Sequence, residues 1–373
     1  MILFLSNGHG EDAIGVRIHA ALGLPARAWA MVGEGAAWAR AGVETVGPSS
    51  RLPSEGFGTL SLGHFLRDLR AGWVQAYLRQ AAFARRLAGY RLAVAVGDVV
   101  PLAAGLIAQL PVAFVSCAKS AWYGGSGTGH DALDHRLMRR AAAVFPRDAL
   151  TAARLAAAGV PVRDRGNPMM DGLDPRDPAA LCPPGETAVA LLPGSRADAV
   201  GNARLLLEAA ARLPGIRALV AATPAMDPRA AVPEGWAPHP WDAPLPGAPH
   251  LALRHAGRAR ALIVSDRFAD CLHAASLALG TAGTANEQAA GLGLPLVAVP
   301  GTGNQGAAFV AMKARYFGPA AVTAPRDPAA IAAIAEALLA DPARRAAMGA
   351  AGRARMGPPG AAAAIAADIR GLL

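Results

Sequence analysis

The tetrapeptide Pro193-Gly194-Ser195-Arg196 combines residue types that bind phosphate groups. Gly194 lets the backbone approach a ligand closely, Ser195 adds a hydroxyl group, and the guanidinium group of Arg196 suits phosphate oxygens. The tetrapeptide follows the apolar run 188–192, which is typical of a buried parallel strand, and precedes a helical pattern. Because a helix N-terminus offers unpaired N–H groups, the turn predicts a diphosphate site. Pro-Gly turns are common, so an ordinary strand–helix turn with a surface arginine is the alternative.

Three ionisable side chains, His9, Glu11 and Asp12, follow the apolar segment 1–5. That segment has the composition of a buried strand, and 13–22 has the periodicity of a helix. Open parallel sheets bind ligands at the carboxyl ends of their strands, so these side chains are candidate catalytic groups. Helix capping by Glu11 or Asp12 is the alternative. The nearby glycines lack the spacing of the dinucleotide fingerprint, which disfavours a dehydrogenase.

Further polar groups follow other apolar runs. Asp98 comes directly after the expected strand 92–97, where a carboxylate is a good candidate for a general base. Gly283 and Thr284 stand at a second junction between small residues and a helical pattern. The polar loop after 296–299 carries Asn304 and Gln305. The loop 117–127 is polar and aromatic, as substrate loops often are.

The elements that position these residues form two successive α/β halves. In each half, apolar strands are followed by helices, which predicts open parallel sheets covered on both faces. We expect an N-terminal domain over 1–166, a Pro- and Gly-rich linker over 167–187, and a C-terminal domain over 188–373. Whether the last C-terminal helix packs back on the first domain is left open. Further strands are expected at 28–32, 43–46, 112–116, 142–145, 162–165, 218–222, 261–264 and 296–299.

Composition narrows the class of protein. The 373 residues are 53% hydrophobic, which excludes a disordered chain. The net charge is +9, and nearly all basic residues are arginine, which leaves an anionic substrate, an anionic membrane surface or a biased codon usage as explanations. We find no nucleic-acid-binding module. The three cysteines are widely spaced, so a reducing cytoplasm is the simplest compartment. No apolar run is long enough to span a membrane.

The segment 64–91 interleaves apolar and aromatic residues with arginines. This pattern suits a helix that lies on an anionic bilayer. A helix packed on its own sheet with a solvated basic face explains the pattern as well, and we favour that interpretation.

Taken in order, these features resemble the GT-B glycosyltransferases, above all lipid-A-disaccharide synthase and then the lipid-II-forming N-acetylglucosaminyltransferase. The resemblance spans nearly the whole chain. Its most specific part is Leu191-Leu192-Pro193-Gly194-Ser195-Arg196. The other matching stretches are Ser6 to Asp12, Val96-Gly97-Asp98, Val115-Ser116 leading to Ala121-Trp122, Gly166-Asn167-Pro168 and Gly283-Thr284-Ala285.

The resemblance implies a GT-B architecture, with two Rossmann-like domains facing a central cleft. It implies a UDP-sugar donor, of the N-acetylglucosamine type, held by the C-terminal half. There Gly194, Ser195, Arg196, Gly283 and Thr284 would face the diphosphate, with Asn304 and Gln305 near the donor sugar. The N-terminal half would hold a lipid or lipid-linked acceptor, at the inner face of the cytoplasmic membrane. Asp98 matches an acidic residue that is important in lipid-A-disaccharide synthases.

Three departures mark a divergent relative. The family's first-loop glutamate falls near Gly8, so Glu11 or His9 would have to replace it, whereas Asp12 aligns well. The family's ribose-binding glutamate aligns with Gln288, and Glu287 sits one residue early. A glutamine binds a ribose hydroxyl less strongly than a carboxylate does. The loop 119–129 matches neither relative, which leaves the acceptor open.

The chemistry expected is an inverting transfer, in which a base takes the proton of the acceptor hydroxyl. Asp98 is our first choice for the base and Glu11 the second. Helix N-termini and Arg196 would stabilise the departing diphosphate, so we expect neither a metal nor a cofactor, and no Asp-x-Asp pair is evident. Two alternatives stay open. One is a UDP-sugar 2-epimerase, and the other is a non-catalytic protein that binds a nucleotide sugar or a lipid.

Overall fold

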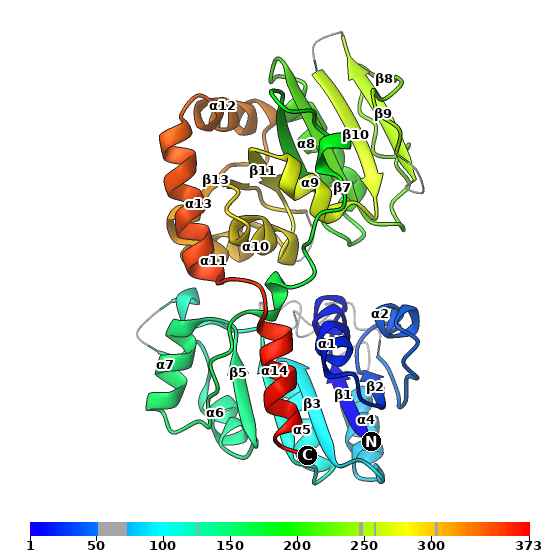
Figure 1. The fold of residues 1–373 in the computed structure, drawn as a ribbon, viewed down its shortest axis with the longest axis vertical. Helices are drawn as coiled ribbons and strands as arrows, with labels where there is room; N and C mark the ends of the chain where they lie inside the picture. The colour runs from blue at the N-terminus through cyan, green and yellow to red at the C-terminus, as the bar shows by residue number, and fades with distance from the viewer. Residues whose placement is uncertain (51–72, 125–126, 246–248, 257–258, 303–304) are drawn as a thin grey trace. The chain divides into compact units, whose positions relative to one another are not determined.

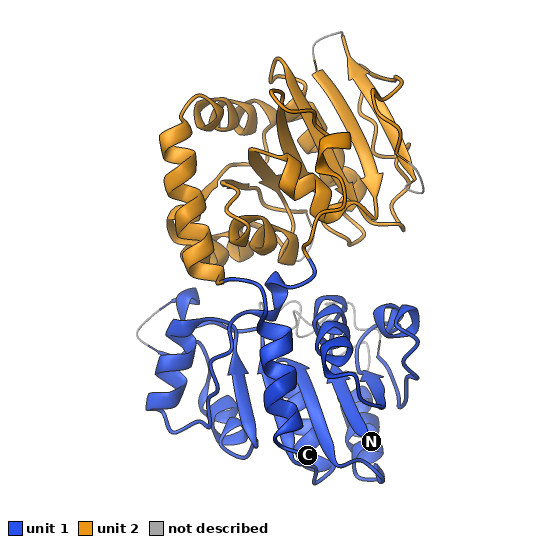
Figure 2. Ribbon diagram, viewed as in Figure 1, with its two compact units in different colours: residues 1–172, 358–373 blue, residues 173–357 orange. Residues whose placement is uncertain are grey.

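The computed structural model describes residues 1–50, 73–124, 127–245, 249–256, 259–302 and 305–373. These residues form two compact units (Figure 2). Unit 1 comprises 1–172 and 358–373, and unit 2 comprises 173–357. Each unit is a sheet covered by helices, so the expected α/β class is confirmed.

The sheet of unit 1 is parallel throughout, in the order β2-β1-β3-β4-β5. Its inner strands are apolar and buried along their whole length, because helices cover both faces. The strands are β1 (Ile2–Ser6), β2 (Ala26–Ala30), β3 (Leu92–Gly97), β4 (Val112–Ser116) and β5 (Ala143–Pro146). The helices are α1 (His9–Leu22), α2 (Ala36–Arg40), α4 (Trp73–Ala84), α5 (Val99–Ile107), α6 (Ala132–Met138), α7 (Ala149–Ala157) and α14 (Ala361–Arg370), with short 3-10 turns η2 (Ala121–Tyr123) and η3 (Pro168–Met170).

Alternate residues of the strands feed two cores in unit 1, as the two-residue period of a strand requires. Phe4 on β1 packs with Ile14 of α1 and Ile365 of α14 on one face. Leu5, its neighbour, packs on the other face with Leu102 of α5. Both faces are therefore closed, and the open part of the sheet is its edge at the ends of the strands.

The sheet of unit 2 has the order β13-β12-β11-β6-β7-β10-β9-β8, in which β9 runs antiparallel to both of its neighbours, β10 and β8, and the other pairs are parallel. The strands are β6 (Thr187–Leu192), β7 (Ile216–Ala222), β8 (Trp236–Pro238), β9 (His250–His255), β10 (Ala259–Ser265), β11 (Leu277–Gly280), β12 (Leu296–Ala298) and β13 (Ala321–Thr323). The helices are α8 (Ala199–Ala210), α9 (Phe268–Ala274), α10 (Thr284–Gly291), α11 (Ala307–Phe317), α12 (Pro328–Leu339) and α13 (Pro342–Met356), with 3-10 turns η4 (Pro178–Ala180) and η5 (Gly318–Ala320).

Two expected strands are wrong. The segments 43–46 and 162–165 each reach the edge of the sheet of unit 1, but each forms only an isolated bridge, Thr45 with Ala28 and Val162 with Val144. The sequence analysis also missed short strands of unit 2, including β11 and β13. These strands have four and three residues, too short for a periodic pattern to distinguish them from a turn.

The domain boundaries also differ from the expected ones. The first part of the expected linker belongs to unit 1, where Asp171 accepts hydrogen bonds from the backbone N–H groups of Gly360 and Ala362. The second part belongs to unit 2, where Asp270 on α9 accepts from the backbone N–H groups of Arg176 and Asp177. The last helix, α14, lies beside α1 in unit 1 (Figure 1), which is the arrangement that the sequence analysis left open.

The segment 64–91 is described only from residue 73 onward, so its first arginines lie outside the described residues. Its helix α4 packs on unit 1, because the Phe83 ring meets Trp29 at 4.8 Å and Gln80 donates to the backbone oxygen of Met31. This part of the helix therefore covers its own sheet. Within the described residues, no helix is long and apolar enough to cross a membrane.

Candidate functional site

Three loops of unit 2 lie together because they follow the neighbouring strands β6, β11 and β12. Thr281, after β11, donates from its backbone to the oxygen of Leu192 (3.0 Å) and from its hydroxyl to the oxygen of Pro193 (3.1 Å). Arg326 donates to the backbone oxygen of Pro300, after β12, and to Asn202 of α8, both at 2.8 Å. The structure thus brings the expected phosphate-binding turns to one edge of the sheet. The sequence analysis missed Arg326 and Asn202, whose hydrogen bonds connect these loops, since neither residue belongs to a motif.

The turn after β6 is longer than the sequence suggests. Gly194 adopts a positive φ of 90°, which favours glycine, and Ser195 is exposed beside a half-buried Arg196. Helix α8 begins only at Ala199. Its N-cap residue, Asp198, makes no side-chain capping hydrogen bond. The N-terminus of this helix therefore follows the tetrapeptide by two residues instead of adjoining it.

The N-terminus of α10 adjoins the same edge, as expected for Gly283 and Thr284. Thr284 is exposed at the first helical position. With its amide oriented to satisfy both partners, Gln305 donates to the oxygen of Thr281 (3.0 Å) and accepts from the N–H of Gly283 (3.2 Å). Gln305 therefore contacts the expected phosphate-facing turn directly. Asn304 lies outside the described residues.

The two candidates for a ribose contact are both buried. Glu287 is 2% exposed, and its carboxylate accepts from Nζ of Lys313 at 2.5 Å. The structure corrects its assignment as a donor-binding residue, because this carboxylate is engaged in an internal ion pair. Gln288 is 7% exposed and lies on the same helix, so it has little surface to offer a ligand.

At the corresponding edge of unit 1, Asp98 lies with residues of the first loop. Strands β1 and β3 are neighbours, so Asn7 and Asp98 leave the sheet side by side. Asn7 hydrogen-bonds the Asp98 carboxylate, which also accepts from the N–H of Val100 at 2.8 Å and so caps α5. Gly97 has a φ of 126°, and a side chain there would collide with Asn7 and crowd Glu11. Asn7 is thus a site residue that the sequence analysis passed over.

Asp98 is partly exposed at this edge of the sheet. Burial raises the pKa of Asp98, while the hydrogen bonds from Val100 and Asn7 and the charge of Lys119 oppose that rise. A carboxylate with a raised pKa is a better proton acceptor near neutral pH. The electrostatics therefore suit the role of a base.

The structure separates the other candidates of the first loop into those that stay accessible and one that is buried. Helix α1 begins at His9, earlier than expected, so Glu11 and Asp12 lie in its first turn instead of in a loop. His9 is exposed, with its ring near Gly33, and Glu11 folds back toward Gly8. These two residues remain candidates.

Asp12 is not a candidate, which corrects the sequence analysis. Its side chain is 0% exposed and accepts from the hydroxyl of Ser6 (2.6 Å) and from Nε1 of Trp38 (3.2 Å). Burial raises the pKa of Asp12. A substrate cannot reach this carboxyl group without opening the core, so its role is structural.

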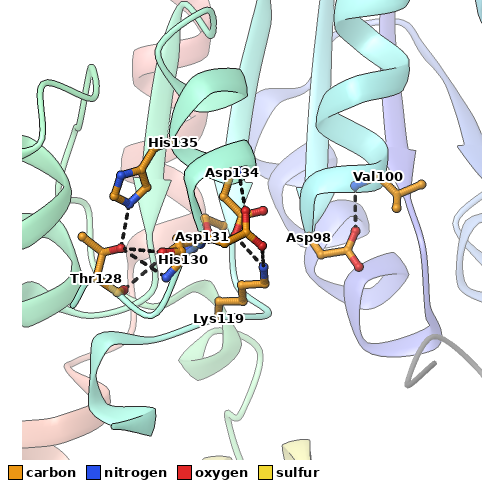
Figure 3. Close-up of polar contacts among 9 residues, drawn as sticks. Asp98, Val100, Lys119, Thr128, His130, Asp131, Asp134 and His135 are labelled. Atoms are coloured by element: carbon orange, nitrogen blue, oxygen red, sulfur yellow. Dashed lines mark hydrogen bonds and ion pairs between the residues drawn. The ribbon is translucent and has the colours of Figure 1, made fainter. Parts of the chain in front are cut away.

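A second group of polar side chains lines a small pocket of unit 1 together with Asp98 (Figure 3). Nζ of Lys119 lies 2.5 Å from Asp134 and 3.6 Å from Asp131. Ser116, at the end of β4, lies 3.0 Å from Nε2 of His130. The sequence analysis singled out the loop after β4 but not His130 or Asp134. Those residues come 14 and 18 positions after Ser116, and only the return of the chain into α6 brings them back.

The described residues hold no group of three His, Cys, Asp or Glu side chains placed to bind a metal ion. The donor-site residues described above are glycines, hydroxyls, an amide and arginines.

Comparison with known proteins identifies the family of folds to which this structure belongs. No protein-family model matches the chain, and no curated protein matches it. Among solved structures, MurG of Acinetobacter baumannii is 14% identical, with 99% of each chain covered and a TM-score of 0.61. The calicheamicin glycosyltransferase CalG4 is 17% identical over 100% of this chain and 98% of that one, with a TM-score of 0.63. The chain has the GT-B fold.

The GT-B fold is shared by proteins with other activities. A Listeria monocytogenes protein, provisionally assigned as a UDP-N-acetylglucosamine 2-epimerase, is 13% identical over 99% of this chain and 94% of that one, with a TM-score of 0.57. Identities this low establish architecture alone. The function must therefore be argued from the site.

Proposed function

We propose that this chain is an inverting glycosyltransferase that needs no metal and moves a sugar from a UDP-linked donor to a lipid or lipid-linked acceptor. The observation that carries the proposal is the convergence of the loops after β6, β11 and β12 in unit 2. That edge combines Gly194, Ser195 and Arg196 with the N-terminus of α10. Such a set of N–H groups, a hydroxyl and a guanidinium suits a diphosphate.

The leaving group explains why these residues would matter for the rate. When the bond to the anomeric carbon breaks, negative charge develops on the diphosphate. Arg196 and the N–H groups after β11 would stabilise that charge where it forms. This electrostatic role is the one that a metal ion has in other transferases, so the proposed chemistry proceeds without one.

Asp98 is the proposed base, and Glu11 is the second choice. Asp98 would take the proton of the acceptor hydroxyl, whose oxygen attacks the anomeric carbon and inverts it. Its raised pKa supports this assignment. Asn7, which hydrogen-bonds Asp98, would fix the carboxylate in place.

The finer details rest on the resemblance and on the names of the similar proteins. CalG4 is named as a glycosyltransferase, and the Listeria protein is named for a UDP-N-acetylglucosamine substrate. We therefore favour a donor of the N-acetylglucosamine type. A lipid-A-disaccharide-synthase-like reaction at the inner face of the cytoplasmic membrane, with peripheral contact through 64–91, remains a proposal that the motif resemblance supports.

The test is a thermal-shift screen of the purified protein against UDP, UDP-N-acetylglucosamine, other UDP-sugars, GDP and NAD. A ligand that binds only the folded state raises the unfolding midpoint by mass action. We expect stabilisation by UDP and UDP-sugars and none by NAD. If no nucleotide stabilises the protein, the donor site is wrong, and a non-catalytic role becomes the better proposal.

A UDP-sugar 2-epimerase is the second candidate, because the Listeria protein has the same fold. The two activities differ in their need for an acceptor. An epimerase converts UDP-N-acetylglucosamine to its 2-epimer with no acceptor present and keeps the UDP attached. Proton NMR of the donor after incubation with the protein alone distinguishes them, since formation of the epimer would replace the transferase proposal.

A further inference from the structure

The backbone oxygen of Pro193 is an anchoring point at the start of the proposed diphosphate-binding turn in unit 2. This oxygen accepts from Nδ2 of Asn202 at 3.2 Å and from the hydroxyl of Thr281 at 3.1 Å. Gly194, the next residue, has open space around it, because the atoms nearest to a side chain placed there belong to Ala282, 3.9 Å away. The contacts at Pro193 therefore fix where the turn leaves the sheet.

Asn202 is a buried residue of α8 whose amide group is oriented by two partners. Its Nδ2 donates to the oxygen of Pro193, and its Oδ1 accepts from Nη1 of Arg326 at 2.8 Å. Because a carbonyl oxygen only accepts and a guanidinium group only donates, a single orientation of the amide satisfies both partners. Asn202 is 1% exposed, so it has no surface to offer a ligand. It can influence a ligand only through the residues that it contacts.

Arg326 extends this connection to the loop after β12. The same nitrogen, Nη1, also donates to the backbone oxygen of Pro300 at 2.8 Å. Strands β6 and β12 are not neighbours in the sheet, since β11 lies between them. The hydrogen-bonded path from Pro193 through Asn202 and Arg326 to Pro300 therefore links two loops that the strands do not join directly.

We propose that Arg326 and Asn202 are positioning residues of the donor site, which hold the turn 193–196 against the loop after β12 in the arrangement that binds a diphosphate. This inference rests on the proposed donor site. A turn that is already ordered loses less conformational freedom when it binds a ligand, so its N–H groups and side chains bind more tightly. The effect should fall on the diphosphate part of the ligand, because the two residues fix the turn that faces it.

The experiment compares wild type with Arg326→Ala, Asn202→Ala and the double variant. Arg204→Ala is the matched control, because Arg204 also donates to a backbone oxygen at 2.8 Å, but that oxygen belongs to Ala230, in the connection from β7 to β8. Ligand-observed NMR titrations give the dissociation constants of UDP and of uridine for each protein. The ratio of the two constants isolates the contribution of the diphosphate, and urea unfolding measures the stability of each variant.

We expect Arg326→Ala and Asn202→Ala each to weaken the binding of UDP about 10-fold, as for the loss of one hydrogen bond, and to leave the binding of uridine unchanged. Since both residues act through one path, the double variant should lose about as much as either single variant, instead of the roughly 100-fold that independent effects would give. Arg204→Ala should keep both dissociation constants.

Three results would overturn the inference while leaving the donor site in place. They are an unchanged ratio of constants in both single variants, an equal weakening of UDP and uridine, and losses that add in the double variant. If wild type binds UDP no more tightly than uridine, the donor site itself is wrong and the inference fails with it. Asn202→Ser replaces Asn202→Ala if the alanine variant does not fold, because a serine leaves a polar group at the buried position but is too short to reach both partners.

Discussion

Nζ of Lys313 lies 2.5 Å from Oε1 of Glu287 inside unit 2, where both side chains are nearly closed off from solvent. Lys313 and Lys119 are the only lysines in the chain. The ammonium group also lies 5.5 Å from the ring centres of Phe309 and Tyr316. The pair joins α10, whose N-terminus faces the proposed donor site, to α11.

Breaking this pair from one side should destabilise unit 2. Lys313→Met leaves the Glu287 carboxylate buried without its main cation, which costs roughly 3–5 kcal/mol of unfolding free energy. The double variant Lys313→Met/Glu287→Met removes both charges and should recover most of the loss. Urea unfolding, followed by circular dichroism, measures both. Equal stability of wild type and the single variant would contradict the structural role.

Asp12→Asn should make the protein at least as stable at pH 7 and leave its activity intact. The pKa of Asp12 is raised in the folded state, so its contribution to stability is fully present below about pH 4 and is lost as the pH rises through the folded-state pKa. The charged form is therefore a cost at neutral pH. An asparagine keeps an oxygen for Ser6 and Trp38 without the charge, and we expect a gain on the order of 1 kcal/mol at pH 7.

The measurement for Asp12 is urea unfolding of wild type and variant from pH 4 to pH 8. The gain should shrink toward pH 4, because the ionised form of Asp12 that destabilises the folded state becomes protonated as the pH falls. Loss of transferase activity in a variant with normal stability would contradict us and restore Asp12 to the catalytic group.

Arg196→Ala should abolish most of the thermal shift caused by UDP and most of the transferase activity, without unfolding the protein. Arg196 is half-buried in the turn after β6, where the charge of the leaving diphosphate would develop. Arg212→Ala is the control, since Arg212 lies two residues beyond the C-terminal end of α8, where its side chain donates to the backbone oxygen of Glu208. A UDP response in Arg196→Ala equal to wild type would remove this residue from the donor site.

Asp98→Asn should lower the transfer rate by about 10²- to 10⁴-fold while UDP still binds. An asparagine oxygen can still cap α5 by accepting from the N–H of Val100, so the fold should survive. Asp327→Asn is the control, because Asp327 caps α12 in the same way, with Ala330 as the donor at 2.7 Å. If both substitutions have the same small effect, Asp98 is only a helix cap.

Asp171→Ala should loosen the attachment of α14 to unit 1. The carboxylate of Asp171 binds two N–H groups at the start of that helix, and losing a cap of this kind costs about 0.5–2 kcal/mol. Hydrogen exchange should show faster exchange across 361–370. Asp341→Ala removes the cap of α13 instead, at the N–H of Arg344, and should leave exchange in α14 unchanged. Unchanged protection of α14 in Asp171→Ala would refute this anchoring role.

The strands that the sequence predicted best are the long apolar runs. The runs at 92–97 and 112–116 are strands over those same residues, because a strand buried on both faces must be apolar at every position. The turn Pro193-Gly194-Ser195-Arg196 and Asp98 were also located correctly at the ends of strands. Local composition is enough for such features, since each depends on residues that are adjacent in the chain.

The first residues of helices and the partners of polar side chains were harder to predict. Helix α1 begins at His9 with no side-chain cap, so no capping residue in the sequence indicated where it starts. Glu287 has the right type and nearly the right position for a ribose contact, and only its ion pair with Lys313, 26 residues away, shows that it is engaged elsewhere. The type of Asp12 likewise suggested an accessible polar residue, but the folded chain buries it against Trp38 and Ser6.

The sequence by itself determined an α/β protein in two halves and the turns where ligands would bind, because short-range pattern decides which segments become strands and helices. The tertiary structure decided which turns meet. The order of strands places the loops of β6, β11 and β12 together in unit 2, and it places Asn7, Asp98 and Ser116 at the ends of three neighbouring strands of unit 1. It also returns α14 to unit 1 and brings His130 to Ser116. Such contacts depend on packing between segments that are distant in the chain, and a local sequence pattern carries no information about that packing.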